Sequence, residues 1–403
     1  MATSPVSSAA QKRQCVPSQT EPRVEVEKHK RPREDEVTSS RASPEPLSKR
    51  TRASVWETIS DARIGYWREH ELVLPALARK KSPASLRRKR SDGSIDAETV
   101  VTKTRSDRVP RELKSAPYRH PRYVRELGER GSYLMRKYKD ISVESRELCQ
   151  KLLESPQSPP RDTLFEDDLF QDTLDAIIGG NEIRVIRDIA PLIVPSAEIL
   201  AIRGAKHLEM LRETTNASWD NAIPLYGPRP QPDYGLGFKR EAFTKEQGQK
   251  LRPFIGNDWE DCSYFAATYD MYFPFLTSEV TRELDVADWQ NAHSQAVSSR
   301  GLFELFRLVG RQKELHNTIS GFSYSHTDVD VRIWAHLIVT NGDDLEFYRE
   351  PIAKFCIQRT AQADNRWVGW TVTKNILDLW VADHLKRICS AIDMLPTGVD
   401  FEL

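Results

Sequence analysis

The spacing of apolar residues divides the chain into a polar first part and a second part with regular periodicity. Up to about residue 115, large apolar side chains are too sparse to offset the roughly 1–2 kcal/mol per residue that ordering a backbone costs. Beyond that point, stretches with helical spacing and stretches with strand alternation follow one another. The pattern predicts a long disordered, basic, Ser/Pro-rich tail over residues 1–117 and a globular domain over residues 118–403.

The order of these stretches predicts a mixed α/β (α+β) domain. Ser196, which follows Pro195, and Asp285 are the predicted N-caps of two of its helices. Helices are predicted at residues 143–154, 164–178, 196–212, 241–251, 285–315 and 375–394. Strands are predicted at residues 223–226, 233–238, 271–281, 345–348 and 366–373, and an antiparallel hairpin is predicted at residues 319–339.

The net charge of zero conceals two regions of opposite sign. The chain has 59 Lys+Arg and 59 Asp+Glu residues, of which residues 1–160 hold 34 basic and 22 acidic ones. All 14 Phe and seven of the nine Trp lie after residue 160, so only the second part can bury a large core. The globular part is therefore net negative, which counts against an extended nucleic-acid-binding surface on it.

Several classes of protein are excluded by composition. The sequence has no run of eighteen apolar residues and begins without the apolar region of a secretory signal, so a soluble intracellular protein with no membrane partner is expected. The five cysteines are odd in number, widely spaced and free of any Cys-x-x-Cys pair. This usage predicts neither a disulfide framework nor a thiolate zinc site, and it favours a reducing compartment.

Dense cation clusters in the tail predict nuclear import. The clusters at residues 79–81 and 87–90 have the two-part form of an import signal, which a nuclear import receptor would bind. We therefore predict a nuclear protein, and otherwise a cytoplasmic one. The same cations would attract nucleic acid through its phosphates without reading sequence, although they also fit a merely solubilising role. The aromatic segment around Trp56 and Trp67 is predicted either to bind a partner or to dock on the globular domain.

Familiar catalytic signatures, such as a P-loop or a zinc-binding H-E-x-x-H, are absent from the sequence. One pair of acidic residues remains: Asp233 opens a predicted strand, and Glu279 ends the apolar strand that begins at Met271. A carboxylate at the end of a buried strand is expected to be ion-paired or metal-bound, because an unpaired buried charge is costly. Two such groups offer the hard oxygen ligands that Mg²⁺ prefers, and a metal held there activates water for attack on a phosphodiester. The pair therefore predicts a site for Mg²⁺ or Mn²⁺.

Five phrases of the sequence carry a resemblance to known proteins. They are residues 195–200 (PSAEIL), 229–234 (RPQPDY), 272–276 (YFPFL), 290–294 (QNAHS) and 386–393 (KRICSAID). The stretch from about residue 118 to residue 396 resembles a widespread fungal domain of unknown function with a PD-(D/E)XK nuclease-like core. The core of that superfamily is a helix, a three-strand meander, a helix and a further strand. The resemblance implies a restriction-endonuclease-like mixed sheet flanked by helices.

The resemblance also implies roles for individual residues. Asp233 and Glu279 would be metal ligands, and Glu198 on the preceding helix would be the extra acidic ligand that some members have. The carbonyl of the residue after Glu279 would complete the ligand set. Gln290 and His293 lie at i and i+3 on the following helix, so they share one face and would reach the same cleft.

Position 281 departs from the pattern of the superfamily. A lysine is expected there to orient the attacking water, and this chain has Thr281, which offers no positive charge. Loss of such an electrostatic stabiliser commonly lowers a rate by about a hundred- to a thousand-fold. Lys239 and Arg240, beyond the Asp233 strand, are candidate substitutes. A second departure is the long separation between the two carboxylates, which requires an insertion inside the meander.

Two functions follow from these features. The first is a metal-dependent phosphodiesterase acting on nucleic acid, with Asp233, Glu279, Thr281, Gln290 and His293 as candidate catalytic residues. The alternative is a catalytically inactive nuclease-fold scaffold or a nucleic-acid-associated interaction protein in the nucleus. The two carboxylates favour the first function, whereas Thr281 and the negative globular part favour the second. On a purely structural interpretation, Asp233 belongs to a turn, Glu279 to a solvent-facing strand edge, and His293 to an ordinary hydrogen bond.

Overall fold

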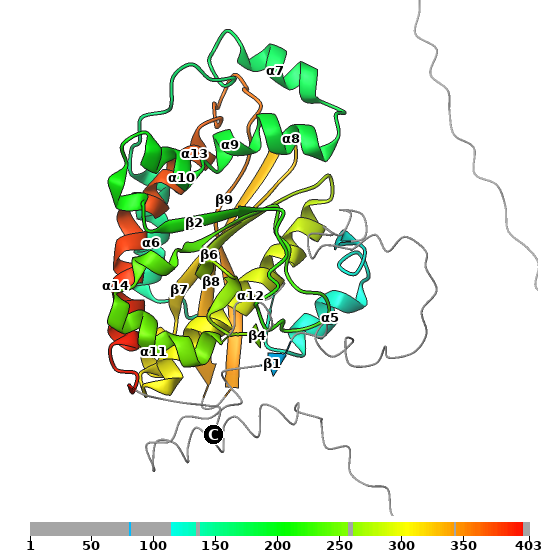
Figure 1. The fold of residues 1–403 in the computed structure, drawn as a ribbon. Helices are drawn as coiled ribbons and strands as arrows, with labels where there is room; N and C mark the ends of the chain where they lie inside the picture. The colour runs from blue at the N-terminus through cyan, green and yellow to red at the C-terminus, as the bar shows by residue number, and fades with distance from the viewer. Residues whose placement is uncertain (1–79, 82–113, 134–137, 257–260, 342–343, 398–403) are drawn as a thin grey trace, which may run out of the picture. The chain divides into compact units, whose positions relative to one another are not determined.

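The computed structural model describes residues 80–81, 114–133, 138–256, 261–341 and 344–397 (Figure 1). Most of the tail predicted to be disordered lies outside these residues, and so does the aromatic segment around Trp56. The import-like clusters also lie outside them, except for the backbone of Lys80–Lys81. Lys80–Lys81 form β1, which pairs antiparallel with β4 (Asp261–Cys262). The described structure therefore extends upstream of residue 118, where the globular domain was predicted to begin.

The described residues form a mixed sheet of seven strands. Its members are β2 (Leu211–Thr215), β3 (Tyr234–Phe238), β5 (Ala266–Thr268), β6 (Met271–Val280), β7 (Thr318–His326), β8 (Asp330–Asn341) and β9 (Asp344–Cys356). The strand order is β2-β3-β6-β7-β8-β9, with β5 paired to β6. The β6–β7 pair is parallel, and the other pairs are antiparallel. A parallel pair needs a crossover connection, and the long helix α12 (Leu284–Leu308) provides it.

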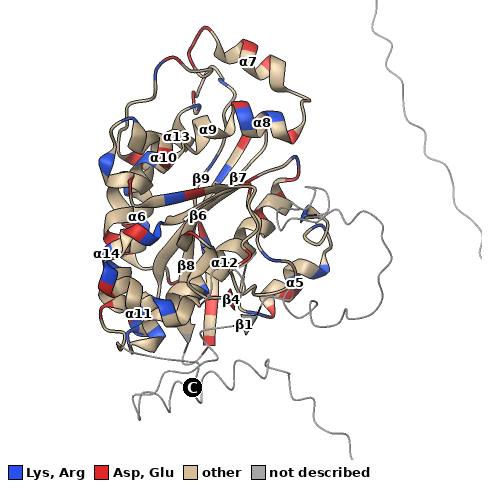
Figure 2. Ribbon diagram, viewed as in Figure 1, with Lys and Arg blue, Asp and Glu red and all other residues tan. Residues whose placement is uncertain are grey.

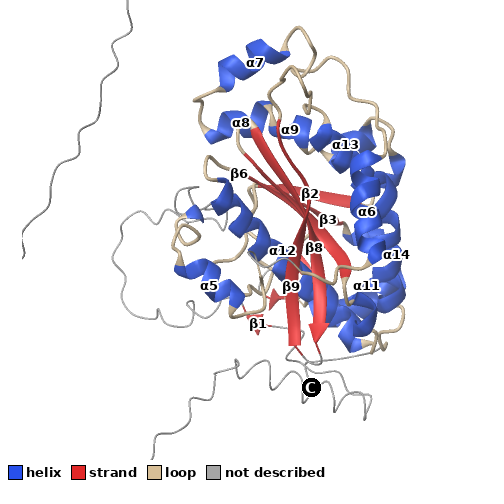
Figure 3. Cartoon of the chain, turned by 180° about the vertical axis from the view of Figure 1, so that it is seen from behind, coloured by secondary structure: helices blue, strands red, loops and turns tan. Residues whose placement is uncertain are grey.

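Helices cover both faces of this sheet. Besides α12, they are α5 (Arg122–Gly128), α6 (Val143–Glu154), α7 (Phe170–Ile177), α8 (Glu182–Asp188), α9 (Ala190–Ile193), α10 (Ala197–Ile202), α11 (Lys245–Ile255), α13 (Val368–Asn375) and α14 (Val381–Ile392). Figures 1 and 3 show α12 and α5 on one side of the sheet and α6 and α14 on the other. Strand β6 lies in the middle, and all ten of its residues are buried. None of the helices in the described ranges is long and apolar enough to cross a lipid bilayer.

The mixed α+β class and several elements are confirmed. The bounds of α6 are those predicted, and β3, β6 and the β7–β8 hairpin lie within a residue or two of the predicted positions. Ser196 caps α10 as expected, because its side chain accepts a hydrogen bond from the Ile199 N–H. The insertion required inside the meander is also present, since α11, β4 and β5 lie between β3 and β6.

Several predicted elements were wrong in type or extent. Residues 366–373 were predicted as a strand but form most of α13, because Val372, Ile376 and Trp380 recur every fourth residue and bury one continuous helical face. Tertiary packing here overrides the strand preference of a stretch rich in β-branched and aromatic residues. Residues 223–226 lie in a loop.

The helix predicted at residues 196–212 ends early. α10 stops at Ile202, and Gly204 follows with φ +117, a conformation that favours glycine. The chain then enters β2, where Leu211 pairs with Phe238 of β3. The helix predicted from residue 164 begins only at Phe170, and Leu164 and Leu169, which helical spacing would place on its buried face, are 41% and 43% exposed. The neighbouring aromatic residues Phe165 and Phe170 are buried instead.

Candidate active site

Asp233 and Glu279 are brought together by the antiparallel pairing of β3 with β6. Tyr234, the first residue of β3, is paired with Ser278, so the residue before it lies beside the end of β6. The Val280 backbone N–H donates a hydrogen bond to Asp233 Oδ2 at 2.9 Å, which fixes the orientation of this carboxylate. Both carboxylates are 2% exposed. Glu279 is therefore not on a solvent-facing strand edge.

Lys114 joins the two carboxylates. Its Nζ lies 2.9 Å from Asp233 Oδ1 and 2.9 Å from Glu279 Oε2, so these two oxygens are no farther apart than twice that distance. The lysine itself is 8% exposed. Burial by itself would lower the pKa of Lys114, but the charges and hydrogen bonds of Glu279 and Asp233 outweigh burial and raise that pKa above its usual value. Lys114 is therefore a cation shared by both acidic residues.

Nothing in the sequence pattern pointed to Lys114. It lies four residues before the predicted start of the globular domain, in a segment without a recognisable motif. Its partners are 119 and 165 residues away in the chain. Of the expected substitutes, Arg240 instead donates a hydrogen bond to the Tyr272 hydroxyl at 2.9 Å, and the Lys239 backbone N–H bonds the Met210 carbonyl.

His293 lies on α12 and contacts Tyr118, which follows Lys114 by four residues in the chain. The Tyr118 hydroxyl is 3.0 Å from its Nδ1, and Tyr118 in turn packs on Tyr123 with 4.5 Å between ring centroids. Burial lowers the pKa of His293 to about 3 and raises the pKa of Tyr118, which also senses the nearby charges of Tyr123 and Glu279. Both groups are therefore neutral at physiological pH. Among the described residues, none hydrogen-bonds to His293 Nε2.

The other predicted site residues differ in their surroundings. Gln290 is buried on α12, one turn from His293. Thr281 is buried directly after β6, where its Oγ1 accepts a hydrogen bond from the Glu283 N–H at 3.3 Å. Glu198 contacts a different set of residues: its Oε1 lies 3.1 Å from Arg212 Nη1 and accepts a hydrogen bond from the Glu213 N–H. The structure thus brings Asp233 and Glu279 together, whereas Glu198 is engaged by an arginine.

The donor set near Lys114 suits a hard cation. Within the described ranges, no three His, Cys, Asp or Glu side chains cluster in a way that could hold a metal ion, so the acidic groups described here are a pair. Both are carboxylates, and one oxygen of each lies 2.9 Å from the Lys114 ammonium. Mg²⁺ is commonly held by one or two carboxylates and keeps several waters, so two ligands suffice for such a site.

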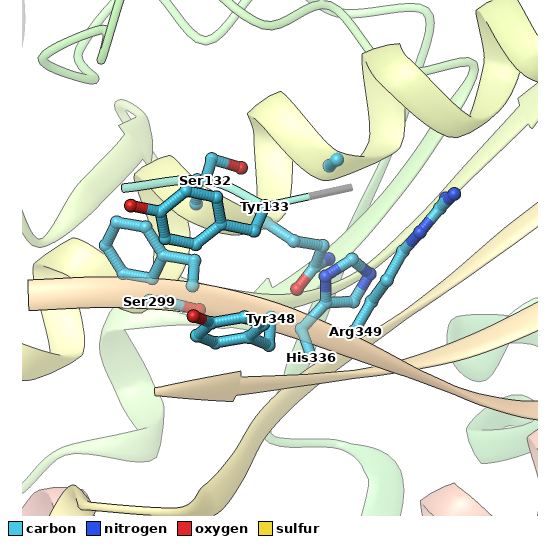
Figure 4. A pocket seen from close by; sticks show the side chains of 10 residues that line it. Ser132, Tyr133, Ser299, His336, Tyr348 and Arg349 are labelled. Atoms are coloured by element: carbon cyan, nitrogen blue, oxygen red, sulfur yellow. The ribbon is translucent and has the colours of Figure 1, made fainter. Parts of the chain in front are cut away.

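A polar recess that does not include the carboxylate pair lies between α12 and the strands β8 and β9 (Figure 4). Figure 4 shows His336 and Arg349 from β8 and β9 beside Ser299 of α12 and Ser132. His336 Nε2 is 2.8 Å from the Ser323 hydroxyl, and Arg349 lies 3.3 Å from a carboxylate oxygen of α12 and stacks over the Trp334 ring. Burial and the nearby Arg349 charge lower the pKa of His336 to about 3. These polar groups serve packing between α12 and the sheet.

Charges of both signs are interspersed on the helices. Figure 2 shows both basic and acidic positions on helices such as α6 and α8. Many of them form short-range pairs, such as Arg122 with Glu126 at 2.9 Å.

The family match spans the whole seven-stranded sheet, from β2 to β9. Residues 169–392, more than half of the chain, match the family model for a domain of unknown function, DUF7924. The chain belongs to the DUF7924 family. No curated protein and no solved structure gave a significant match. The DUF7924 match includes Asp233, Glu279 and His293, whereas Lys114 and Tyr118 precede it. The fungal origin implied by the resemblance stays a prediction.

Proposed function

We propose that this protein is a metal-dependent phosphodiesterase of the PD-(D/E)XK type that acts on nucleic acid. The observation that carries the proposal is the position of Lys114, whose Nζ is 2.9 Å from both Asp233 and Glu279. The resemblance implies two carboxylates with a lysine beside them. Position 281 holds a threonine, but Lys114 places a lysine beside the two carboxylates.

The order of elements around the carboxylates supports a nuclease-like core. α10 is followed by the antiparallel strands β2, β3 and β6, then by α12 and the parallel strand β7. This is the helix, three-strand meander, helix and strand that the resemblance implies. Asp233 lies directly before β3 and Glu279 lies near the end of β6, close to the positions that the resemblance implies for the ligands.

Asp233 and Glu279 would hold the metal, Mg²⁺ or Mn²⁺. When bound, such a metal supplies an activated water and neutralises charge that develops on the phosphodiester. The chain prepares the site by orienting Asp233 with the Val280 N–H and by burying both carboxylates, which strengthens their attraction for a cation. The predicted basic tail would bring nucleic-acid phosphates toward the domain.

Lys114 would take the role that Thr281 cannot fill. Its raised pKa keeps the ammonium charged at physiological pH, so it can stabilise negative charge on a phosphodiester held near the carboxylates. Thr281 accepts a hydrogen bond from the backbone N–H of Glu283, the residue before α12, and carries no charge. The positive group thus comes from a segment far from β6 in the chain.

A second candidate function is a catalytically inactive scaffold. The observation that favours it is enclosure, because Lys114, Asp233, Glu279 and His293 are all less than a tenth exposed. In that case Lys114 would be a permanent counter-ion for two structural carboxylates. Metal binding distinguishes the two functions.

Titration calorimetry with Mn²⁺ tests the proposal on the full chain. We expect the wild type to bind Mn²⁺ and Asp233→Asn to lose the binding heat, because the amide replaces a charged oxygen ligand. Lys114→Met should retain binding but cleave DNA or RNA about a hundred- to a thousand-fold more slowly in the presence of Mg²⁺. Lys386→Met, which changes a lysine on the surface of α14, is the matched control and should leave both measurements unchanged. Absence of binding heat and of cleavage in the wild type would leave the scaffold as the function.

A further inference from the structure

The proposed site is closed by a segment that precedes the family match. Residues 114–128, which we call the lid segment, carry Lys114, Tyr118 and helix α5. With this segment in place, the two carboxylates are 2% exposed and His293 is fully buried. A phosphodiester cannot contact side chains that are shielded to this degree.

The lid segment is attached by a small set of contacts. Tyr118, Tyr123 and Leu127 form a hydrophobic cluster with Val286 and Ala292 of α12, and this cluster is separate from the main core. Figures 1 and 3 show α5 beside α12, on the side of the sheet opposite α14.

Polar contacts within the described ranges add to this cluster. Near the carboxylates they are the Lys114 ion pairs and the bond between the Tyr118 hydroxyl and His293. Farther along the segment, Arg119 forms an exposed ion pair with Glu283 at 3.2 Å, and the Tyr123 hydroxyl donates a hydrogen bond to the Tyr226 carbonyl at 3.4 Å. A unit with few buried apolar contacts opens at a lower free energy than the whole fold.

The residues that follow the lid segment, 131–133, are fixed to the sheet. The Phe347 N–H donates to the Gly131 carbonyl at 2.7 Å, and the Phe347 carbonyl accepts from the Tyr133 N–H at 2.9 Å. Gly131 has φ +80, and a Cβ there would lie 2.5 Å from the Leu345 carbonyl oxygen, so glycine is required at this close approach to β9. The attachment at residues 131–133 therefore provides a fixed point next to a loosely held segment.

We propose that residues 114–128 are a hinged lid that must open before a metal ion and a phosphodiester reach Asp233 and Glu279. In the closed state Lys114 occupies the space between the carboxylates and serves as their built-in counter-ion. On opening, water replaces it. On closing over a bound phosphodiester, the lid returns the ammonium to the site and excludes water. This inference rests on the proposed function for its ligands, but the opening can be measured without any metal.

Hydrogen exchange of the metal-free full chain tests the opening. The amides of α5 should exchange much faster than those of β6, because they open locally rather than by global unfolding. Tyr118→Phe removes one hydrogen bond and should speed exchange in α5 by about three- to tenfold. The matched control is Tyr324→Phe, which removes the hydroxyl of a fully buried tyrosine that accepts a hydrogen bond from Thr373 in the main core. It should leave exchange in α5 unchanged.

Stopped-flow binding of Mn²⁺ tests whether the opening controls access. If the lid must open first, the observed rate reaches a plateau at high Mn²⁺ concentration, and the plateau equals the opening rate. Tyr118→Phe should raise this plateau by the same factor as the exchange rate, and Tyr324→Phe should not.

The outcomes separate this inference from the proposed function. Mn²⁺ binding whose rate rises linearly without a plateau, or α5 amides that exchange as slowly as those of β6, would overturn the lid and leave the metal site in place. No Mn²⁺ binding, together with fast exchange of α5 that Tyr118→Phe accelerates, would remove the proposed function while the opening itself stands.

Discussion

Around the carboxylates, Thr281 has a structural role and Lys114 an electrostatic one, although the two residues are distant in the chain. Thr281 Oγ1 accepts a hydrogen bond from the Glu283 N–H and thereby helps to start α12. A positive charge beside both acidic residues comes from Lys114, whose flexible stem lets its ammonium reach them from outside the sheet. A buried carboxylate needs a partner, and the partner does not have to be near it in the sequence.

Substitution of Lys114 should lower the free energy of unfolding by an amount that depends on Glu279. Loss of one member of a buried ion pair typically costs about 3–5 kcal/mol, and water entering beneath an open lid would reduce the cost for Lys114→Met. The second substitution Glu279→Gln removes one of the two charges left behind. The double variant should therefore be more stable than the sum of the single effects, with a coupling of about 0.5–3 kcal/mol in urea unfolding. Additive effects of the two changes would show that Lys114 and Glu279 do not interact.

At the scale of elements, α12 determines the position of the site because it is buried along most of its length. Polar side chains on it bond the sheet: Asn291 Oδ1 lies 2.7 Å from Thr277 Oγ1, and its amide donates to the Tyr324 carbonyl at 2.7 Å. These bonds fix the rotation of α12, so that His293 faces Tyr118 of the lid segment. Satisfied polar groups of this kind specify one packing arrangement, because any other rotation leaves them buried without partners.

Two glycines in helices should respond oppositely to alanine. At Gly301 in α12, an added Cβ would lie 2.1 Å from the Tyr264 carbonyl oxygen, so the helix must move from β5 and its neighbours. At Gly248 in α11, no atom lies within 4 Å of the added Cβ. We expect Gly301→Ala to lower the free energy of unfolding by about 1–3 kcal/mol and Gly248→Ala to raise it by about 0.5–1 kcal/mol. Urea unfolding of both variants checks this, and a free energy of unfolding that is unchanged or raised in Gly301→Ala would show that the close approach of α12 is not as described.

At the scale of the whole molecule, three of the four buried histidines in the described ranges contribute to the response to acid. Burial lowers the pKa values of His293, His336 and His384 to about 3, and nearby arginines contribute at the last two. In the unfolded chain these groups titrate near 6.5, so between pH 6.5 and pH 3 the unfolded state binds protons that the folded state does not. Stability is therefore fully present above pH 6.5 and falls as the pH is lowered toward 3.

The substitution His384→Phe should reduce this acid sensitivity. His384 stacks on Trp380 with 4.1 Å between ring centroids and lies among other aromatic rings, so phenylalanine can replace it in the packing. Each fully buried neutral histidine should cost about 2 kcal/mol of stability between pH 6.5 and pH 5. Urea unfolding at both pH values should show a loss about a third smaller in His384→Phe. The control His120→Gln, at an exposed position, should keep the wild-type difference; an equal loss in all three proteins would contradict the assignment to His384.

Local pattern was sufficient for elements that carry their own signal. The apolar period of residues 143–154, the Ser196 cap and the uninterrupted apolar strand β6 are properties of neighbouring residues, so the sequence alone determined them. The two carboxylates were found for the same reason, because an acidic residue at the end of a buried strand conflicts with its surroundings unless it has a partner. The strand prediction for residues 366–373 was wrong, because a stretch rich in Trp, Val and Thr takes the structure that its packing partners impose.

Only the tertiary structure decided which partner the carboxylates have. Lys114 and Tyr118 are ordinary residues in a polar segment, and they gain importance because the sheet and α12 bring Asp233, Glu279 and His293 beneath them. Charge attraction and burial act over a few ångströms of space and take no account of sequence separation. The sequence by itself thus determined the class of fold and the acidic pair, whereas the cation between them and the segment that covers them emerged from contacts more than a hundred residues apart.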